Sequence, residues 1–209
     1  MIQRVYEQCV KAELDRVVVA TDDDRIFVHV KNFGGEVIMT SDQHQSGTDR
    51  IAEAAEKLNL NSEAIVLNIQ GDEPIINEND INLLISVLKK TPLTIATLVG
   101  ALTEKQARDR NTVKALLDNN KIIMFTRSPI FTTQSLYVKR HIGVYGFSKA
   151  MTEKIDKNIM IETSNEIVEN LEQIRWGDNG ISFNYARAAG LYKGIDTQKD
   201  LDYVRTFLN

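Results

Sequence analysis

Long apolar runs are missing from this chain. No stretch approaches the ~20 residues that a membrane-spanning helix needs, and the charged N-terminal segment is unlike a secretory signal peptide. The single cysteine, Cys9, cannot form an internal disulfide, and its place on a helical pattern favours packing over nucleophilic chemistry. These absences predict a cytoplasmic protein in a reducing compartment, with no membrane partner.

Basic residues are fewer than acidic ones, and proline is scarce. The chain has 25 Lys and Arg against 29 Asp and Glu, a net charge of −4, which argues against binding nucleic acid through a broad basic surface. With only 3 prolines and 11 glycines, no linker rich in Pro, Gly and Ser divides the 209 residues, of which 43% are hydrophobic. We therefore expect a single domain over residues 1–209 with a sizeable core, with two small domains as the alternative.

Helical and strand patterns alternate through the first part of the chain. Helical spacing over residues 2–12 is followed by a β-branched strand at 16–20, a helix at 25–32 and a strand at 37–40. Aspartates at 22–24 suit a helix cap, and the glycines after Phe33 suit a left-handed helix end. This rhythm is typical of parallel strands joined by crossover helices, and predicts an α/β fold with a mostly parallel sheet.

Less regular patterns follow in the second half. An Asn-Asn pair between two strand-like runs predicts a hairpin, since asparagine tolerates positive φ. The expected elements are a helix at 78–89, strands at 93–99, 112–118, 121–125 and 137–147, a short helix or turn at 104–109, a helix at 166–176, a strand at 181–189 and a C-terminal helix.

An acidic turn ends the most apolar strand. The run Ile65-Val66-Leu67-Asn68-Ile69 stops in Gln70-Gly71-Asp72-Glu73-Pro74, where glycine allows a tight turn and proline ends the strand pairing. In open α/β sheets, ligands bind outside the carboxyl ends of strands. Asp72 and Glu73 could therefore hold a hard divalent cation, or they could simply cap the next helix and begin a solvated loop.

Two further polar segments are candidates for ligand binding. Ser46-Gly47-Thr48 offers hydroxyl and N–H groups at a predicted helix start, which suits an anionic or hydrogen-bonding ligand but equally an ordinary N-cap. Arg127, Arg140 and His141 form a cationic group that could bind a carboxylate or phosphates, or pair with surface acids.

Several segments taken in order resemble one family. They are Val-Ala-Thr-Asp-Asp-Asp-Arg-Ile (19–26), Gly-Gly-Glu-Val-Ile-Met-Thr-Ser (34–41), His-Gln-Ser-Gly-Thr-Asp-Arg (44–50), Asn-Ile-Gln-Gly-Asp-Glu-Pro (68–74), Arg-His-Ile-Gly-Val-Tyr-Gly (140–146), Leu-Glu-Gln-Ile-Arg-Trp (171–176) and Gly-Ile-Asp-Thr (194–197). No single motif is decisive, but the ordered set covers nearly the whole chain. It resembles the 3-deoxy-manno-octulosonate cytidylyltransferases of lipopolysaccharide synthesis.

The resemblance implies an activity and a fold. Such enzymes transfer CMP from CTP to the anomeric hydroxyl of 3-deoxy-manno-octulosonate (Kdo), release pyrophosphate and require Mg²⁺. It implies a Rossmann-like, nucleotide-diphospho-sugar transferase-like three-layer α/β sandwich and a homodimer. A smaller region around residues 127–187 is expected to cover the sugar site and take part in dimerisation.

The resemblance also assigns roles to individual residues. Asp72 and Asp196 match the family's catalytic metal ligands, and Arg127 matches a residue that would hold the Kdo carboxylate or shape its pocket. The substrate-binding positions implied are Ser46 and Gly47 for cytosine, Gln70 for nucleotide and sugar, Arg140, His141 and Tyr145 for the sugar acid, and Glu172 and Gln173 for sugar hydroxyls.

The chain departs from the family pattern at three places. The family opens with a strand and a basic loop, Pro-Ala-Arg-x-x-Ser-x-Arg-x-Pro-Gly-Lys-Pro-Leu, whereas the segment 1–6 here matches the helix after that loop. The segment 128–137 is short, and Gln198 replaces a usual proline. We expect a misassigned start or a truncated gene rather than a true short variant, with weak or absent turnover because the loop's contacts to the triphosphate are charge-assisted.

Two other functions compete with this one. A cytidylyltransferase for a related acid, such as 8-amino-Kdo or a nonulosonic acid, would differ only near Arg127, His141 and Gln173. Alternatively, the chain could be an inactive homologue that acts only as a binding or assembly partner. Binding of CTP with Mg²⁺ would separate this last function from an enzyme.

Overall fold

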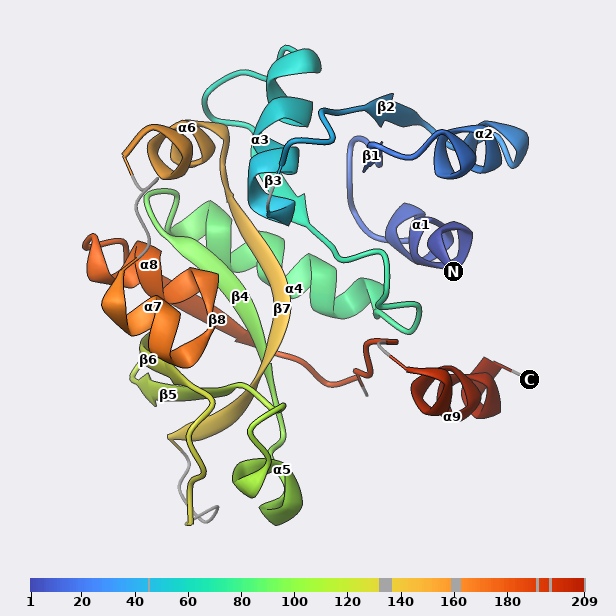
Figure 1. Ribbon diagram of the computed structural model, residues 1–209. Helices are drawn as coiled ribbons and strands as arrows, with labels where there is room; N and C mark the ends of the chain where they lie inside the picture. The colour runs from blue at the N-terminus through green and yellow to red at the C-terminus, as the bar shows by residue number, and fades with distance from the viewer. Residues whose placement is uncertain (45, 132–136, 159–162, 191, 196, 209) are drawn as a thin grey trace. The chain divides into compact units, whose positions relative to one another are not determined.

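The computed structural model describes residues 1–44, 46–131, 137–158, 163–190, 192–195 and 197–208 (Figure 1). Its helices are α1 (Ile2–Val10), α2 (Asp24–Asn32), α3 (Gly47–Lys57), α4 (Glu78–Lys90), α5 (Glu104–Arg108), α6 (Lys149–Asn158), α7 (Ser164–Glu169), α8 (Glu172–Asp178) and α9 (Gln198–Leu208). Its strands are β1 (Val19–Thr21), β2 (Val37–Met39), β3 (Ile65–Asn68), β4 (Ile95–Gly100), β5 (Lys114–Asp118), β6 (Lys121–Thr126), β7 (Val138–Ser148) and β8 (Phe183–Arg187).

The chain divides into two compact units, each built from separate segments of sequence. The first unit is Met1–Leu60, Asn68–Asn82 and Gly190–Asn209, and the second is Asn61–Leu67 and Leu83–Ala189. The chain passes between the units several times, so no single linker separates them. The expectation of one cytidylyltransferase domain stays a prediction.

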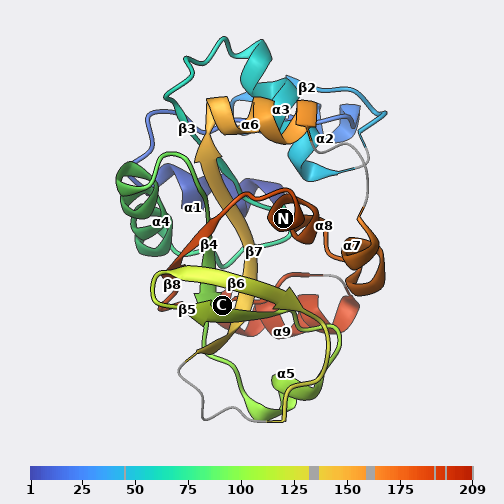
Figure 2. The same ribbon diagram turned by 90° about the vertical axis from the view of Figure 1, so that its left-hand side faces the viewer.

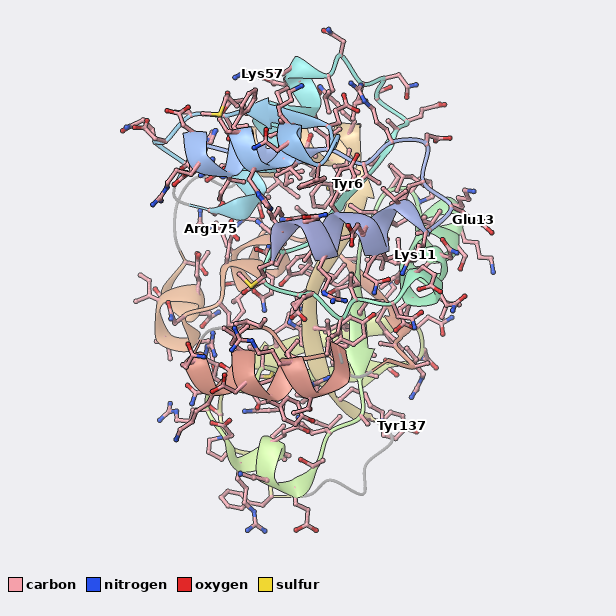
Figure 3. All side chains as sticks on the ribbon, turned by 90° about the vertical axis from the view of Figure 1, so that its right-hand side faces the viewer. Tyr6, Lys11, Glu13, Lys57, Tyr137 and Arg175 are labelled. Carbon is pink, nitrogen blue, oxygen red and sulfur yellow. The ribbon has the colours of Figure 1, made fainter. Side chains whose placement is uncertain are left out.

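The first unit follows the alternating rhythm of the sequence. β1 and β2 pair in parallel, with Val19 opposite Val37. These two valines and Val30 of α2 form a small core, against which Tyr6 of α1 packs (Figure 3). The Tyr6 hydroxyl also accepts a hydrogen bond from the Glu36 N–H at 3.2 Å, so α1 is held to the start of β2 by polar as well as apolar contacts.

Helix ends in this unit confirm the predicted caps. The Asp23 carboxylate accepts hydrogen bonds from the first N–H groups of α2, and Ser46 is the N-cap of α3. Gly34 follows α2 with φ +78°, a conformation that a side chain would strain. Local chemistry therefore determines where these helices begin and end.

The second unit contains a six-stranded sheet in the order β3-β7-β4-β8-β6-β5 (Figure 2). β4 pairs with β8 in parallel, but the pairs β4–β7, β5–β6, β5–β7 and β6–β8 are antiparallel. The prediction of a mostly parallel sheet is thus wrong for these strands. The antiparallel β5–β6 pair follows from the predicted two-residue turn, with Asn119 at φ +52°. The antiparallel pairs of β7 join strands that are distant in sequence, and hydrophobic alternation does not specify their direction.

Helices cover both faces of this sheet. A Cβ atom at Gly146 of β7 would lie 2.4 Å from Leu88 and 3.6 Å from Leu84, so α4 packs closely on that face. Tyr145, the preceding residue, points to the opposite face and contacts Trp176 of α8, with ring centroids 5.5 Å apart. The second unit therefore has the layered α/β/α arrangement that the fold prediction requires.

Two helix predictions differ from the structure. The single helix expected at 166–176 is two helices, α7 and α8, because Asn170 adopts a left-handed conformation with φ +51° and ends the first of them. Helix α6 directly follows β7 and was not predicted. Across the described residues, no helix combines the length and the apolar character needed to cross a bilayer.

Candidate functional site

The start of α3 and the end of β3 meet within the first unit. Ser46 caps α3 by accepting a hydrogen bond from the Asp49 N–H at 3.2 Å. A Cβ atom at Gly47 would lie 3.4 Å from the Gln70 Nε2 and 3.7 Å from the Asn68 Nδ2. The structure therefore brings Ser46, Gly47 and Gln70 together, with hydroxyl, backbone and amide groups side by side.

The acidic turn lies against the segment that precedes Asp196. The Ile195 N–H donates a hydrogen bond to the Asp72 carbonyl at 3.0 Å. A Cβ atom at Gly194 would lie 3.4 Å from the Glu73 Oε1 and 3.9 Å from the Asp72 Oδ2. Asp196 itself is outside the described residues, so its predicted metal contact stays a prediction. Residues 194 and 195 nevertheless reach the turn from more than 100 positions away along the chain.

The donor set at this turn suits a hard divalent cation. Carboxylate oxygens of Asp72 and Glu73 both face the Gly194 segment. Within the described part of the chain, no three His, Cys, Asp or Glu side chains gather into a complete cation cage. An ion here would therefore take part of its shell from water and from substrate phosphates, as Mg²⁺ does at many phosphate-transfer sites.

A polar network supports the loop before α3. Arg50 donates hydrogen bonds to the Thr40 hydroxyl and to Asp22, each at 2.6 Å. Glu53 accepts from the Ser41 N–H at 2.8 Å and also contacts His44. Its pairing with Lys57 is the main reason that the pKa of Glu53 is lowered to about 2. Sequence reasoning did not identify these supports, although Arg50 and Glu53 follow Ser46 at helical spacing.

In the second unit, His141 and Tyr145 lie on one face of β7. The His141 Nε2 is 3.0 Å from the Thr97 hydroxyl, and its ring contacts Phe125 and Tyr145 at centroid distances of 4.9 and 5.4 Å. Although His141 as a residue is only half-buried, removal of its ring from water lowers its pKa to about 3. Burial thus favours the neutral form of His141 at physiological pH, and its role in binding the sugar acid stays a prediction.

Helix α8 completes the same face. Burial raises the pKa of Tyr145, and the negative charge of Glu172, the first residue of α8, raises it further. Gln173 is buried in the next position of the helix. The structure therefore brings His141 and Tyr145 together, with Trp176 of α8 packed against the Tyr145 ring. Arg175 (Figure 3) anchors α8 to α7 through a two-point ion pair with the buried Glu166.

Arg127 is held by the main chain. Its guanidinium donates hydrogen bonds to the carbonyls of Arg110 and Asn111, both at 3.3 Å, and of Asn170 at 3.4 Å. Its N–H donates to the Glu169 carboxylate at 2.6 Å. These contacts favour the pocket-shaping role over direct contact with a sugar carboxylate. The assignment of Arg127 as a catalytic residue stays a prediction.

Arg140 lies over the end of β4. It pairs with Gly100 in the sheet, and a Cβ atom at that glycine would be 3.5 Å from the Arg140 Nη2. The Arg140 guanidinium thus lies beside the end of β4, on the strand that also carries His141.

Lys114 was not identified by sequence reasoning. It is fully buried in β5, and its ammonium group donates hydrogen bonds to the carbonyls of Asp109, Thr112 and Arg127 at 3.0, 2.8 and 2.8 Å. Burial is the main reason that its pKa is lowered. A lysine inside an apolar strand pattern is the signal that could have identified it, because such a charge needs partners.

Comparisons with known proteins agree with this geometry. A family model described as cytidylyltransferase matches residues 1–187. The chain is 39% identical over 214 residues to the 3-deoxy-manno-octulosonate cytidylyltransferase of Fusobacterium nucleatum, covering 100% of this chain and 86% of that protein. It is 40% identical over 226 residues to that of Thermodesulfovibrio yellowstonii, covering 100% and 88%. The chain belongs to the 3-deoxy-manno-octulosonate cytidylyltransferase family.

Solved structures confirm the fold class. A CMP:2-keto-3-deoxy-manno-octonic acid synthetase complexed with CTP matches with a TM-score of 0.90 and 33% identity, over 99% of this chain and 86% of that one. A cytidylyltransferase from Leptospira borgpetersenii matches with a TM-score of 0.61 over 98% and 74%, and at 14% identity it shows the fold alone. This member of the family is a nucleotidyltransferase, and cytidylyltransferases of this kind generally use a divalent metal.

The sequence-predicted positions of this cytidylyltransferase fall into two sets. Ser46, Gly47, Gln70 and Asp72 belong to the first compact unit. Arg127, Arg140, His141, Tyr145, Glu172 and Gln173 belong to the second. Their roles stay predictions, and each set is coherent within its own unit.

The low pKa of His141 makes stability depend on pH. The folded protein keeps His141 neutral down to about pH 3, whereas the unfolded chain takes up a proton near pH 6.5. The free energy of unfolding should therefore fall as the pH drops below 6.5, by up to about 1.4 kcal/mol per pH unit. Between pH 6.5 and 4.5, His141 should lower the free energy of unfolding of wild type by about 2 kcal/mol, and His141→Gln should not show this decrease. Urea unfolding at the two pH values measures the difference.

The matched control is His29→Gln, on the exposed surface of α2, which should keep the wild-type slope. The window ends at pH 4.5 because carboxylates with lowered pKa values, such as Glu53, contribute below it. Equal slopes for wild type and His141→Gln would show that His141 is protonated in the folded protein at these pH values.

Proposed function

We propose that this chain transfers CMP from CTP to the anomeric hydroxyl of Kdo, with Mg²⁺ as its divalent ion, in the cytoplasm. The solved relative with a TM-score of 0.90 is a CMP:2-keto-3-deoxy-manno-octonic acid synthetase in complex with CTP. The observation that carries the proposal is the approach of the Gly194–Ile195 segment to the Asp72 turn, directly before Asp196. It supports a two-carboxylate site at the end of a strand.

The reaction needs charge neutralisation and alignment rather than a covalent intermediate. The anomeric oxygen of Kdo forms a bond to the α-phosphorus of CTP, the bond from that phosphorus to the β-phosphate oxygen breaks, and pyrophosphate leaves. The hydroxyl proton passes to solvent or a nearby base. Asp72 and Asp196 would hold Mg²⁺, which when bound neutralises phosphate charge.

The first unit would bind the nucleotide. Ser46 and Gly47 would receive the cytosine ring, since a hydroxyl and a side-chain-free backbone lie beside the Gln70 amide. Gln70, two residues before Asp72, would reach both nucleotide and sugar. A Cβ atom at Gly47 would meet the Gln70 and Asn68 amides at ordinary van der Waals distances of 3.4 and 3.7 Å, so the backbone here lies directly beside both amides.

The second unit would bind the sugar acid. Neutral His141 offers a ring nitrogen for a hydroxyl rather than a charge for the carboxylate. Arg140 would bind the carboxylate of the sugar acid. Arg127 would shape the pocket through its hydrogen bonds to main-chain carbonyls. Tyr145, Glu172 and Gln173 would contact sugar hydroxyls, an arrangement supported by the packing of α8 on the Tyr145 ring through Trp176.

Direct assay of the chain tests this proposal. We expect CMP-Kdo and pyrophosphate to form from CTP and Kdo only at the weak rate that the sequence predicts, and only when Mg²⁺ is present. The melting temperature should rise with CTP plus Mg²⁺ and with Kdo, because a ligand that binds only the folded state stabilises it. Parallel reactions with 8-amino-Kdo and a nonulosonic acid determine which sugar acid is preferred. If neither CTP nor Kdo shifts the melting temperature and no product forms, the proposed function is wrong.

The family resemblance also implies assembly. We propose a homodimer that uses the region 127–187, which carries the predicted sugar-binding residues of the second unit. Light scattering coupled to size exclusion tests this, because a mass of one 23.6 kDa chain at assay concentration would contradict it.

A further inference from the structure

A buried aspartate joins the first turn of α4 to the segment that leads to Asp196. Asp80 is 0% exposed, and its Oδ2 accepts hydrogen bonds from the Tyr192 hydroxyl at 2.8 Å and the Gly190 N–H at 3.1 Å. The Asn77 N–H donates to the same Tyr192 oxygen at 3.4 Å. Burial of a carboxylate is costly unless hydrogen bonds satisfy it, so this group is unusual among the residues of α4.

The surroundings of the Asp80 carboxylate are tightly packed. A Cβ atom at Gly190 would lie 3.2 Å from the Asp80 Oδ2 and 3.2 Å from the Tyr192 ring, so the glycine permits the close approach. Tyr192 is only 4% exposed. Burial first, and Asp80 second, raise the pKa of Tyr192, so its hydroxyl stays protonated and remains a donor. The contact is therefore present at every pH at which the protein would work.

The segment held by Asp80 is the one that approaches the acidic turn. Three residues after Tyr192, the Ile195 N–H donates to the Asp72 carbonyl at 3.0 Å, and Gly194 lies against Glu73. The described residues of this segment are thus held at two places: Gly190 and Tyr192 bind Asp80, and Ile195 binds the Asp72 carbonyl. Ile195 is the residue before Asp196 in the sequence. A carboxylate delivered by a fastened segment loses less conformational freedom when it binds a cation.

We propose that Asp80, through Tyr192 and Gly190, is a positioning residue that sets the divalent-cation affinity of the Asp72 and Asp196 pair. This inference rests on the proposed function, since it assigns Asp80 to the same metal site. Asp80 does not need to touch the cation or either substrate. Loss of its hydrogen bonds should loosen the segment 190–195 and weaken cation binding about 10- to 100-fold, the usual effect of losing a group that orients a metal ligand.

Two measurements on the full chain test the proposal with Asp80→Asn and Tyr192→Phe. The first is amide hydrogen exchange over residues 190–195 without any metal, where both variants should exchange faster than wild type. The second is titration of Mn²⁺ in the presence of CTP, followed by electron paramagnetic resonance, where half-saturation should move to at least about tenfold higher Mn²⁺. In turnover assays, high Mg²⁺ should rescue the variants, and the KM for Kdo should not change.

Asp202→Asn is the matched control. Asp202 lies on α9 in the same unit, its side chain is 61% exposed, and it accepts hydrogen bonds from Gln198 at 2.9 Å and Arg205 at 3.4 Å within that helix. This variant should match wild type in both measurements. A purely structural role for Asp80 would lower the melting temperature but leave Mn²⁺ half-saturation unchanged at a temperature where the variants are folded, and this result would overturn the proposal.

The failure of this inference can be told apart from failure of the proposed function. If wild type binds no Mn²⁺ with CTP, the proposed function fails, whatever the exchange data show. If wild type binds and Tyr192→Phe binds equally well with unchanged exchange, the positioning role fails alone. Tyr192→Phe removes a single hydroxyl group, so it decides the question even where Asp80→Asn does not fold.

Discussion

In a chain to which the family's basic loop has been added, replacing Asp72 with Asn is expected to lower Mg²⁺-dependent cytidylyl transfer by at least about 100-fold, the scale of losing one preorganised charge-stabilising group at a reacting phosphate. The amide keeps the shape of the side chain but removes the negative charge that would hold the cation. The backbone contact from Ile195 uses the Asp72 carbonyl, which the substitution leaves in place. The loop should therefore stay folded while cation-dependent binding of CTP is lost. Calorimetric titration of CTP with and without Mg²⁺ measures this directly.

Glu73→Gln separates the two acids of the turn. Glu73 faces Gly194, but the sequence assigns the metal to Asp72, so its amide variant should lose much less activity. Asp118→Asn, at the exposed end of β5, is the control and should behave as wild type. Near-normal turnover by Asp72→Asn would show that the acidic turn only shapes the loop.

Replacing Lys114 with Met is expected to lower the free energy of unfolding by about 3 kcal/mol or more. The methionine fills most of the space, but the carbonyls of Asp109, Thr112 and Arg127 lose a charged donor at 2.8–3.0 Å. Each buried acceptor that loses its donor costs roughly 1–3 kcal/mol. Urea unfolding followed by tryptophan fluorescence measures the loss, because Trp176 is fully buried in the same unit.

A second effect should accompany the first. Arg127 donates to the carbonyls of Arg110 and Asn111, and its own carbonyl accepts from Lys114, so both cations hold the segment 109–112. We expect Lys114→Met also to weaken binding of Kdo. Lys121→Met, at the exposed start of β6, should change stability by less than about 0.5 kcal/mol. Equal stability of the two variants would show that the carbonyls find other donors.

Local features of this fold were predictable because they depend on neighbouring residues. Helix starts at Asp23 and Ser46 follow from side chains that accept N–H groups two or three residues away. The hairpin turn at Asn119 and the helix end at Gly34 follow from backbone conformations that these residues tolerate. The ordered motifs also predicted the family, which the comparisons confirm.

Protonation and pairing were not predictable in this way. His141 was expected to be cationic, but Thr97 and Phe125, which are distant in sequence, enclose its ring and lower its pKa to about 3. The left-handed Asn170 divides a helix that periodicity alone makes continuous. The antiparallel pairs of β7 depend on which strand returns beside it, and hydrophobic alternation does not distinguish these arrangements.

The acidic turn shows which features the sequence determined and which features depend on the tertiary structure. The sequence by itself determined that Asp72 follows an apolar strand, that Gly71 and Pro74 end it, and that Asp196 lies in a family motif near the C-terminus. Only the tertiary structure decided that residues 194–195 return to Asp72, and that Asp80 and Tyr192, 112 positions apart, hold the returning segment. The reason is physical: capping and turn preferences act over a few residues, whereas the burial that pairs a carboxylate with a phenol requires the folded chain.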